Sequence, residues 1–153
     1  MARDHGRMPH AVTDSAGWPA LPGRAQWLYM TLLSQRELTA AGTVSLTMNR
    51  WANLCADGDV DVVEEMLWLL TDRGLLHVDP AREELLVRNF AEDHHVLDSP
   101  NQARAYATAF PRIFSPLLQQ LVRAELWALY ALDSEPGHPW AWDALQQIGR
   151  AHV

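Results

Sequence analysis

Residues 47–90 read TMNRWANLCADGDVDVVEEMLWLLTDRGLLHVDPAREELLVRNF, and the order of hydrophobic patterns in this stretch predicts the fold. Thr47 is a good N-cap for a helix whose apolar residues recur at helical spacing, namely Met48, Trp51, Ala52 and Cys55. The chain turns at Asp57-Gly58, and Asp59 caps a second helix with the stripe Val60, Val63, Met66, Leu67 and Leu70. Two amphipathic helices joined through a turn that contains glycine predict a helix-turn-helix.

A helix before this pair and a hairpin after it complete the pattern. The earlier helix carries the apolar face Ala25, Leu28, Tyr29, Leu32 and Leu33, and we expect it to end near Gly42, before a short strand at residues 43–46. Residues 75–78 and 85–90 predict two strands joined by a turn at residues 79–82. The expected fold class is therefore mainly α with a small β-wing (α+β), with a winged helix-turn-helix domain at residues 21–92. We expect its core to bury Leu28, Leu32, Trp51, Cys55, Val63, Leu67 and Leu70 together.

The segments on either side predict less structure. Residues 1–20 have no hydrophobic period and are expected to form a flexible tail. Ser99-Pro100 and Ser115-Pro116 each place an N-cap before a proline, which predicts helices near residues 100–110 and 116–132 in a C-terminal helical extension at residues 93–132. Residues 133–153 are expected to be a poorly defined tail. Its last six residues, IGRAHV, match what a common sequencing adapter encodes in one reading frame, so we expect residues 148–153 to be non-native; the alternative is an ordinary polar end.

Composition argues against several classes of function. No apolar run is long enough to span a membrane, and we expect a cytoplasmic location in a bacterial host cell. The single cysteine, Cys55, lies on an apolar stripe and is expected to be buried and inert. No catalytic motif is recognisable, so we expect neither an enzyme nor a cofactor. Asp93, His94, His95 and Asp98 lack the helical spacing of a zinc site, so no metal is expected either.

The chain also resembles a known family. The stretches RAQWLYMTLLSQ, LTMNRWANLCA, VDVVEEMLWLLTDRGLLHVD, ELLVRNF, SPNQARAYATAF and FSPLLQQLVRAEL are similar to winged-helix, replication-initiation-like proteins of actinobacterial phages and prophages. The resemblance covers about residues 24–128, and its motifs are structural rather than catalytic. It implies binding of double-stranded DNA in replication initiation or transcriptional regulation. The chain departs from many relatives after Phe90, where Glu92-Asp93 replaces a more basic loop.

The charge pattern leaves two functions open. The chain has a net charge of −7, and residues 44–90 hold four Arg against nine acids, a balance of −5. The outward face of the predicted second helix carries Asp61, Glu64, Glu65, Trp68 and Asp72, which suits neither phosphates nor base edges. If DNA is bound, the contacts are expected from Arg50, Arg82, Arg88, Arg24 and Arg36. The alternative is a protein-protein interaction adaptor that docks through Trp68 and its acidic neighbours. These acids also suit an ordinary solvated helix face, and a homodimer stays open.

Overall fold

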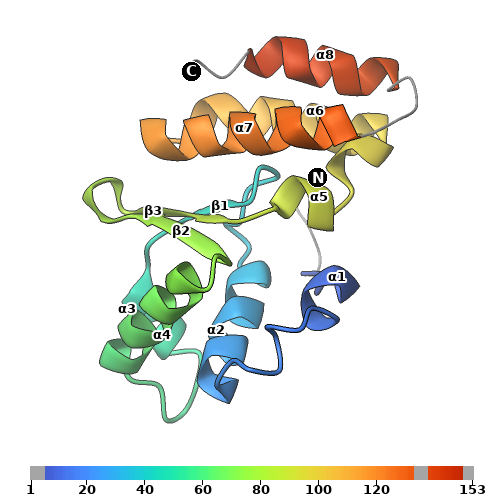
Figure 1. Cartoon of the computed structure of the whole chain (residues 1–153). Helices are drawn as coiled ribbons and strands as arrows, with labels where there is room; N and C mark the ends of the chain where they lie inside the picture. The colour runs from blue at the N-terminus through green and yellow to red at the C-terminus, as the bar shows by residue number, and fades with distance from the viewer. Residues whose placement is uncertain (1–5, 133–137, 150–153) are drawn as a thin grey trace.

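The computed structural model describes residues 6–132 and 138–149 and places a small antiparallel sheet between two layers of helices (Figure 1). One layer holds α2, α3 and α4, and the other holds α6, α7 and α8. The described helices are α1 His10–Thr13, α2 Gly23–Leu33, α3 Met48–Ala52, α4 Val60–Asp72, α5 Phe90–Asp93, α6 Pro100–Ala109, α7 Pro116–Leu132 and α8 Pro139–Ile148. The strands are β1 Thr43–Ser45, β2 Leu76–Asp79 and β3 Glu84–Val87, and short 3-10 turns lie at η1 Pro80–Arg82, η2 Val96–Asp98 and η3 Phe110–Arg112.

The middle strand, β3, is buried on both of its faces. The strand order is β1-β3-β2, and Leu85, Leu86 and Val87 are each at most 1% exposed. Because successive side chains of a strand point to opposite faces, Leu85 and Val87 pack with α2 and α4, whereas Leu86 packs with α6 and α7. The uninterrupted apolar run in β3 is what a strand covered on both faces requires.

Six of the seven residues that we expected in the first core are buried there, and the seventh is not. Leu28, Leu32, Trp51, Val63, Leu67 and Leu70 are buried together. Cys55 is half-exposed instead, because α3 ends at Ala52 and the chain then turns to Gly58. The predicted helix that continued to Asp57 was therefore wrong in length, and its last turn never faces the core.

Other boundaries also differ from the sequence prediction. The first helix ends at Leu33, and residues 34–42 form turns. The predicted two-stranded hairpin is part of a three-stranded sheet, because Thr43–Ser45 pairs with β3 and sets Thr43 opposite Leu86. The returning strand ends at Val87 rather than at Phe90, which begins α5.

The two ends of the described chain pack more firmly than their composition suggested. Residues 1–20 were expected to be a flexible tail, yet Val12 is buried in the first core and the Trp18 ring lies 5.7 Å from that of Tyr29. Residues 133–153 were expected to be poorly defined, yet α8 buries Ala141, Ala144, Leu145 and Ile148. Isolated apolar residues fix the first segment, whereas α8 buries a helical stripe at i, i+3, i+4 and i+7 that the sequence analysis missed. Val153 and the rest of residues 150–153 lie outside the described residues.

The second core holds the C-terminal helices. α6 and α7 lie where the Ser-Pro pairs place them, and Ser99 and Ser115 both accept a hydrogen bond from a backbone N–H in the first turn. Leu118, Val122 and Leu126 of α7 are fully buried there. No helix in the described ranges is long and apolar enough to cross a membrane.

The turn between α3 and α4 depends on one glycine. A Cβ at Gly58 would clash with the carbonyl oxygen of Ala52, a backbone atom that cannot move without opening the end of α3. We expect Gly58→Ala to lower the free energy of unfolding by about 2–3 kcal/mol, which is typical of overpacking. Urea unfolding followed by circular dichroism measures the change. Gly23→Ala is the matched control, because a Cβ at Gly23 would meet nothing within 4 Å; equal effects at both glycines would contradict this account of the turn.

Candidate functional site

The outward face of α4 is acidic and carries an exposed tryptophan. Asp59 caps the helix by accepting a hydrogen bond from Asp61 N at 2.8 Å, so α4 begins where the sequence predicts. Val63, Met66, Leu67 and Leu70 face the core, which leaves the opposite side in solvent. That side presents Asp61, Glu64, Glu65, Trp68 and Asp72, called the α4 face below; all five are exposed, Trp68 by 41%. The structure therefore brings the five predicted protein-interaction residues together on one element.

The five predicted DNA-contacting arginines are spread over separate elements. Arg50 is exposed on α3, Arg36 is exposed in the turns after α2, and Arg24 is exposed at the start of α2. Arg82 is exposed on η1, at the end of the β2–β3 hairpin. Each of these four is exposed, and they come from four different segments of the chain, whereas the acids of the α4 face share one helix.

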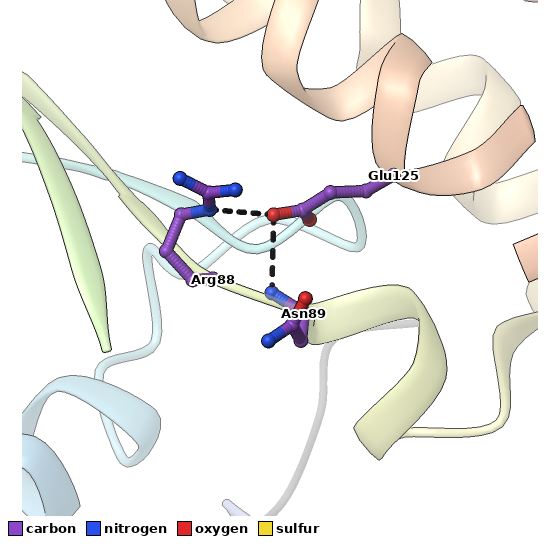
Figure 2. Close-up of polar contacts among 3 residues, drawn as sticks. All are labelled: Arg88, Asn89 and Glu125. Carbon is purple, nitrogen blue, oxygen red and sulfur yellow. Dashed lines mark hydrogen bonds and ion pairs between the residues drawn. The ribbon is translucent and has the colours of Figure 1, made fainter. Parts of the chain in front are cut away.

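Arg88 has a structural contact rather than an open position. Its Nε lies 2.6 Å from Oε1 of Glu125 on α7, and its side chain is only 31% exposed. The same oxygen accepts a hydrogen bond from Asn89 N at 3.2 Å (Figure 2). Glu125 thus ties the end of β3 to α7, and this ion pair offsets the charge that Arg88 would otherwise offer to a phosphate.

The end of the hairpin is held by the start of α7. The Ser115 hydroxyl donates to Asp79 Oδ2 at 2.6 Å and also accepts from Leu118 N, while Glu84 accepts from the backbone N–H of Phe114 and Ser115. The Arg82 guanidinium carbon lies 5.2 Å from the Phe114 ring centroid, a cation–π distance. Arg82 is therefore presented from a fixed hairpin rather than from a loose loop.

A shallow groove of about 390 Å³ lies between the start of α2 and the α3–α4 turn. Arg24, Trp27, Cys55, Asp57 and Met66 are among the residues that line it. The Cys55 thiol donates to Asp57 Oδ1 at 2.9 Å, and this hydrogen bond raises the pKa of Cys55 and lowers the pKa of Asp57. A thiol with a raised pKa is a weaker nucleophile at neutral pH than an ordinary cysteine.

The histidines and acids after Phe90 do not converge on one point. Within the described residues, no three His, Cys, Asp or Glu side chains are placed to hold a metal ion. His95 Nδ1 lies 3.4 Å from Asp98 Oδ2 in an exposed pair, and the His94 ring stacks on Phe90 at 4.2 Å.

Three residues at the junction of the two layers carry no local signal in the sequence for their contacts. Glu125, Ser115 and Asp79 meet partners that are more than 30 positions away along the chain. Only the helix-capping role of Ser115 is visible from its neighbours in sequence. Glu125 is indistinguishable from any helix-surface acid until the fold places Arg88 beside it.

Comparison with protein-family models, with curated proteins and with solved structures finds no match to this chain.

Asp93 on α5 has an unusual electrostatic environment. Burial raises the pKa of Asp93 to about 6, and the nearby Glu92 and Glu125 carboxylates add to this rise. The folded state therefore binds a proton more tightly than the unfolded chain, whose ordinary value is 3.8. The associated stability is present below pH 3.8 and is lost as the pH rises to about 6.

Replacing the Asp93 carboxyl by a neutral amide prevents the loss of stability that the ionisation of Asp93 causes as the pH rises. We expect Asp93→Asn to raise the free energy of unfolding by about 1 kcal/mol near neutral pH, a value reduced for solvent screening of a half-exposed group. At about pH 3.5 the variant and the wild type should differ little, since both carry a neutral side chain. Urea unfolding across this pH range measures the difference. Asp98→Asn, at a side chain 74% exposed, is the control; a gain at Asp93 that did not depend on pH would contradict the expectation.

Proposed function

We propose that this chain is a winged helix-turn-helix protein that docks a positively charged partner protein on the α4 face. The order α2, β1, α3, α4, β2, β3 and the sheet order β1-β3-β2 support a winged helix, with α4 in the place of the second helix of the helix-turn-helix. In this architecture that helix is the one presented to a partner. Its exposed chemistry therefore bears directly on what the protein binds.

One observation carries the proposal: the α4 face has four carboxylates around an exposed Trp68 and no cation anywhere on the helix. A duplex would bring phosphates against these acids without releasing counterions, which removes the main source of DNA affinity. A partner with Lys or Arg side chains gains from the same acids. Trp68 supplies a large apolar anchor at the centre, and tryptophan is enriched among interface hot spots.

DNA binding is the second candidate, favoured by the resemblance to phage winged-helix proteins and by two exposed arginines. Arg50 projects from α3 and Arg82 from the hairpin end, positions from which this architecture contacts phosphates. The pairing of Arg88 with Glu125 argues against this role for Arg88. The exposed arginines that remain are few, and they would have to attract phosphates against the net charge of −5 on residues 44–90.

Peptide selection tests the first candidate. A library of random 20-residue peptides, displayed and selected against the whole chain, should yield binders with Lys or Arg beside an aromatic or aliphatic residue. Trp68→Ala should weaken the selected peptides by about 2 kcal/mol, roughly 30-fold, as expected for a lost hot spot. Trp142→Ala is the matched control, since Trp142 is 44% exposed on α8 and should have no effect.

Duplex binding tests the second candidate in the same preparation. Fluorescence anisotropy with a mixed-sequence duplex at several salt concentrations should detect only weak binding if the α4 face is a protein site. If DNA is the partner, Arg82→Ala and Arg50→Ala should each reduce the salt slope by about one, and Arg104→Ala on α6 should not. Tight, salt-dependent duplex binding that is lost in the arginine variants and unchanged in Trp68→Ala would reject the protein-docking proposal.

A further inference from the structure

The groove between the start of α2 and the α3–α4 turn combines apolar walls with two carboxylates. Trp27, Val62 and Met66 line it with apolar side chains, and the first two of these are half-buried. Asp57 and Asp59 line it from the turn, and both are exposed. Its volume of about 390 Å³ lies within the range of sites that hold a small molecule, so it is large enough for one long side chain of a partner.

The two carboxylates are open to a donor from outside the chain. Within residues 6–132 and 138–149, neither Asp57 nor Asp59 forms an ion pair. Asp59 Oδ1 accepts from the backbone N–H of Asp61, and Asp57 Oδ1 accepts from the Cys55 thiol, which leaves the second oxygen of each carboxylate. The Cys55 hydrogen bond and, to a lesser extent, the charge of Arg24 lower the pKa of Asp57. Asp57 is therefore ionised at neutral pH.

The groove borders the α4 face. Val62 on the wall of the groove and Glu65 of the α4 face are three positions apart on one helix, so their side chains are neighbours on its surface. Asp59, which also lines the groove, immediately precedes the helix. A partner that lies along the α4 face can therefore place one of its side chains in the groove.

We propose that this groove receives one arginine or lysine side chain of the basic partner that docks on the α4 face, an inference that rests on the proposed function. The alkyl stem of such a side chain packs against Trp27, Val62 and Met66, and its charged end meets the carboxylates of the turn. Long basic side chains combine an apolar stem and a charged end in this way.

The charges that line the groove favour a basic occupant over other side chains. Two acids stand against one cation, Arg24, so the balance of the lining residues is negative. An acidic side chain would be repelled by Asp57 and Asp59, and a purely apolar one would gain nothing from them. Arg24 competes with the charge of the incoming side chain, which makes it a test of the sign of the occupant.

Protection of Cys55 from alkylation measures whether the groove is occupied. Cys55 lines the groove and is the only cysteine of the chain, so iodoacetamide labelling followed by mass spectrometry of the whole protein reports on this one position. The probe is the tripeptide acetyl-Ala-Arg-Ala-amide. Its match has citrulline in place of arginine, a side chain of the same shape without the charge. We expect the arginine tripeptide at about 20 mM to slow labelling about threefold, which corresponds to a Kd of about 10 mM, and the citrulline tripeptide to have little effect.

Two substitutions of opposite charge test which kind of side chain the groove prefers. Asp59→Asn keeps a residue that is favoured at N-caps but removes a carboxylate, so it should raise the Kd of the arginine tripeptide about threefold, as for an exposed ion pair. Arg24→Gln removes the competing cation and should lower that Kd about twofold. Asp143→Asn, at an exposed acid of α8, is the matched control and should leave the Kd unchanged.

Equal protection by the two tripeptides, or no protection up to about 20 mM, overturns the proposal. A weaker affinity in Arg24→Gln overturns it as well, because the groove would then prefer an anion. Trp68 is not among the residues that line the groove, so Trp68→Ala should leave the Kd of the tripeptide unchanged. Failure of the α4 face as a docking site is seen with the selected 20-residue peptides and Trp68→Ala, whereas failure of the groove is seen with the tripeptides.

Discussion

The burial of β3 on both faces is the constraint on which the rest of the structure depends. Leu85 and Val87 need the helices α2 and α4 on one side, and Leu86 needs α6 and α7 on the other. Without the C-terminal helices, Leu86 would lie in water. These helices are therefore needed for the same core as α2, α3 and α4, and the contacts of Glu125 and Ser115 fix them to the strand ends. Burial supplies the main driving force, and these polar contacts set the orientation.

This arrangement separates the molecule into surfaces of different chemistry. The α4 face is acidic with an aromatic centre, and the hairpin end carries Arg82 on a fixed support. The two surfaces lie on different elements of the fold. The fold itself does not decide among functions, since similar architectures serve many roles. The exposed side chains decide which partner the protein can bind.

Local patterns predicted α4, α6 and α7 well, but they missed α1, α5 and α8 and predicted tertiary contacts poorly. The stripe of α4, its Asp59 cap and the Ser-Pro starts of α6 and α7 are all encoded within a few residues. The early end of α3 is not, because Gly58 packs against Ala52 only after the turn has formed. That single packing event moves Cys55 from the expected core to a groove. Likewise, the pairing of β1 with β3 joins segments about forty positions apart, which no periodicity reveals.

The candidate site shows the same contrast between what local patterns reveal and what only the fold reveals. Helical winding places Asp61, Glu64, Glu65, Trp68 and Asp72 on one face without any knowledge of the fold, and the structure has them exposed together. The arginines were chosen by their charge and by their expected places at the turn, the hairpin and the ends of the first helix. One of them, Arg88, is paired with Glu125, 37 positions away.

The double-sided cover of β3 also has a consequence for how the chain is made. During synthesis the sheet strands leave the ribosome before α7, so for a time Leu86 has no helix above it. Such an intermediate exposes apolar surface on which another nascent chain can aggregate. Leu86 therefore remains exposed until residues 116–132 have emerged, and cutting the chain between α5 and α6 would make that aggregation-prone state permanent. The order in which the two layers appear thus sets how long this apolar strand stays uncovered.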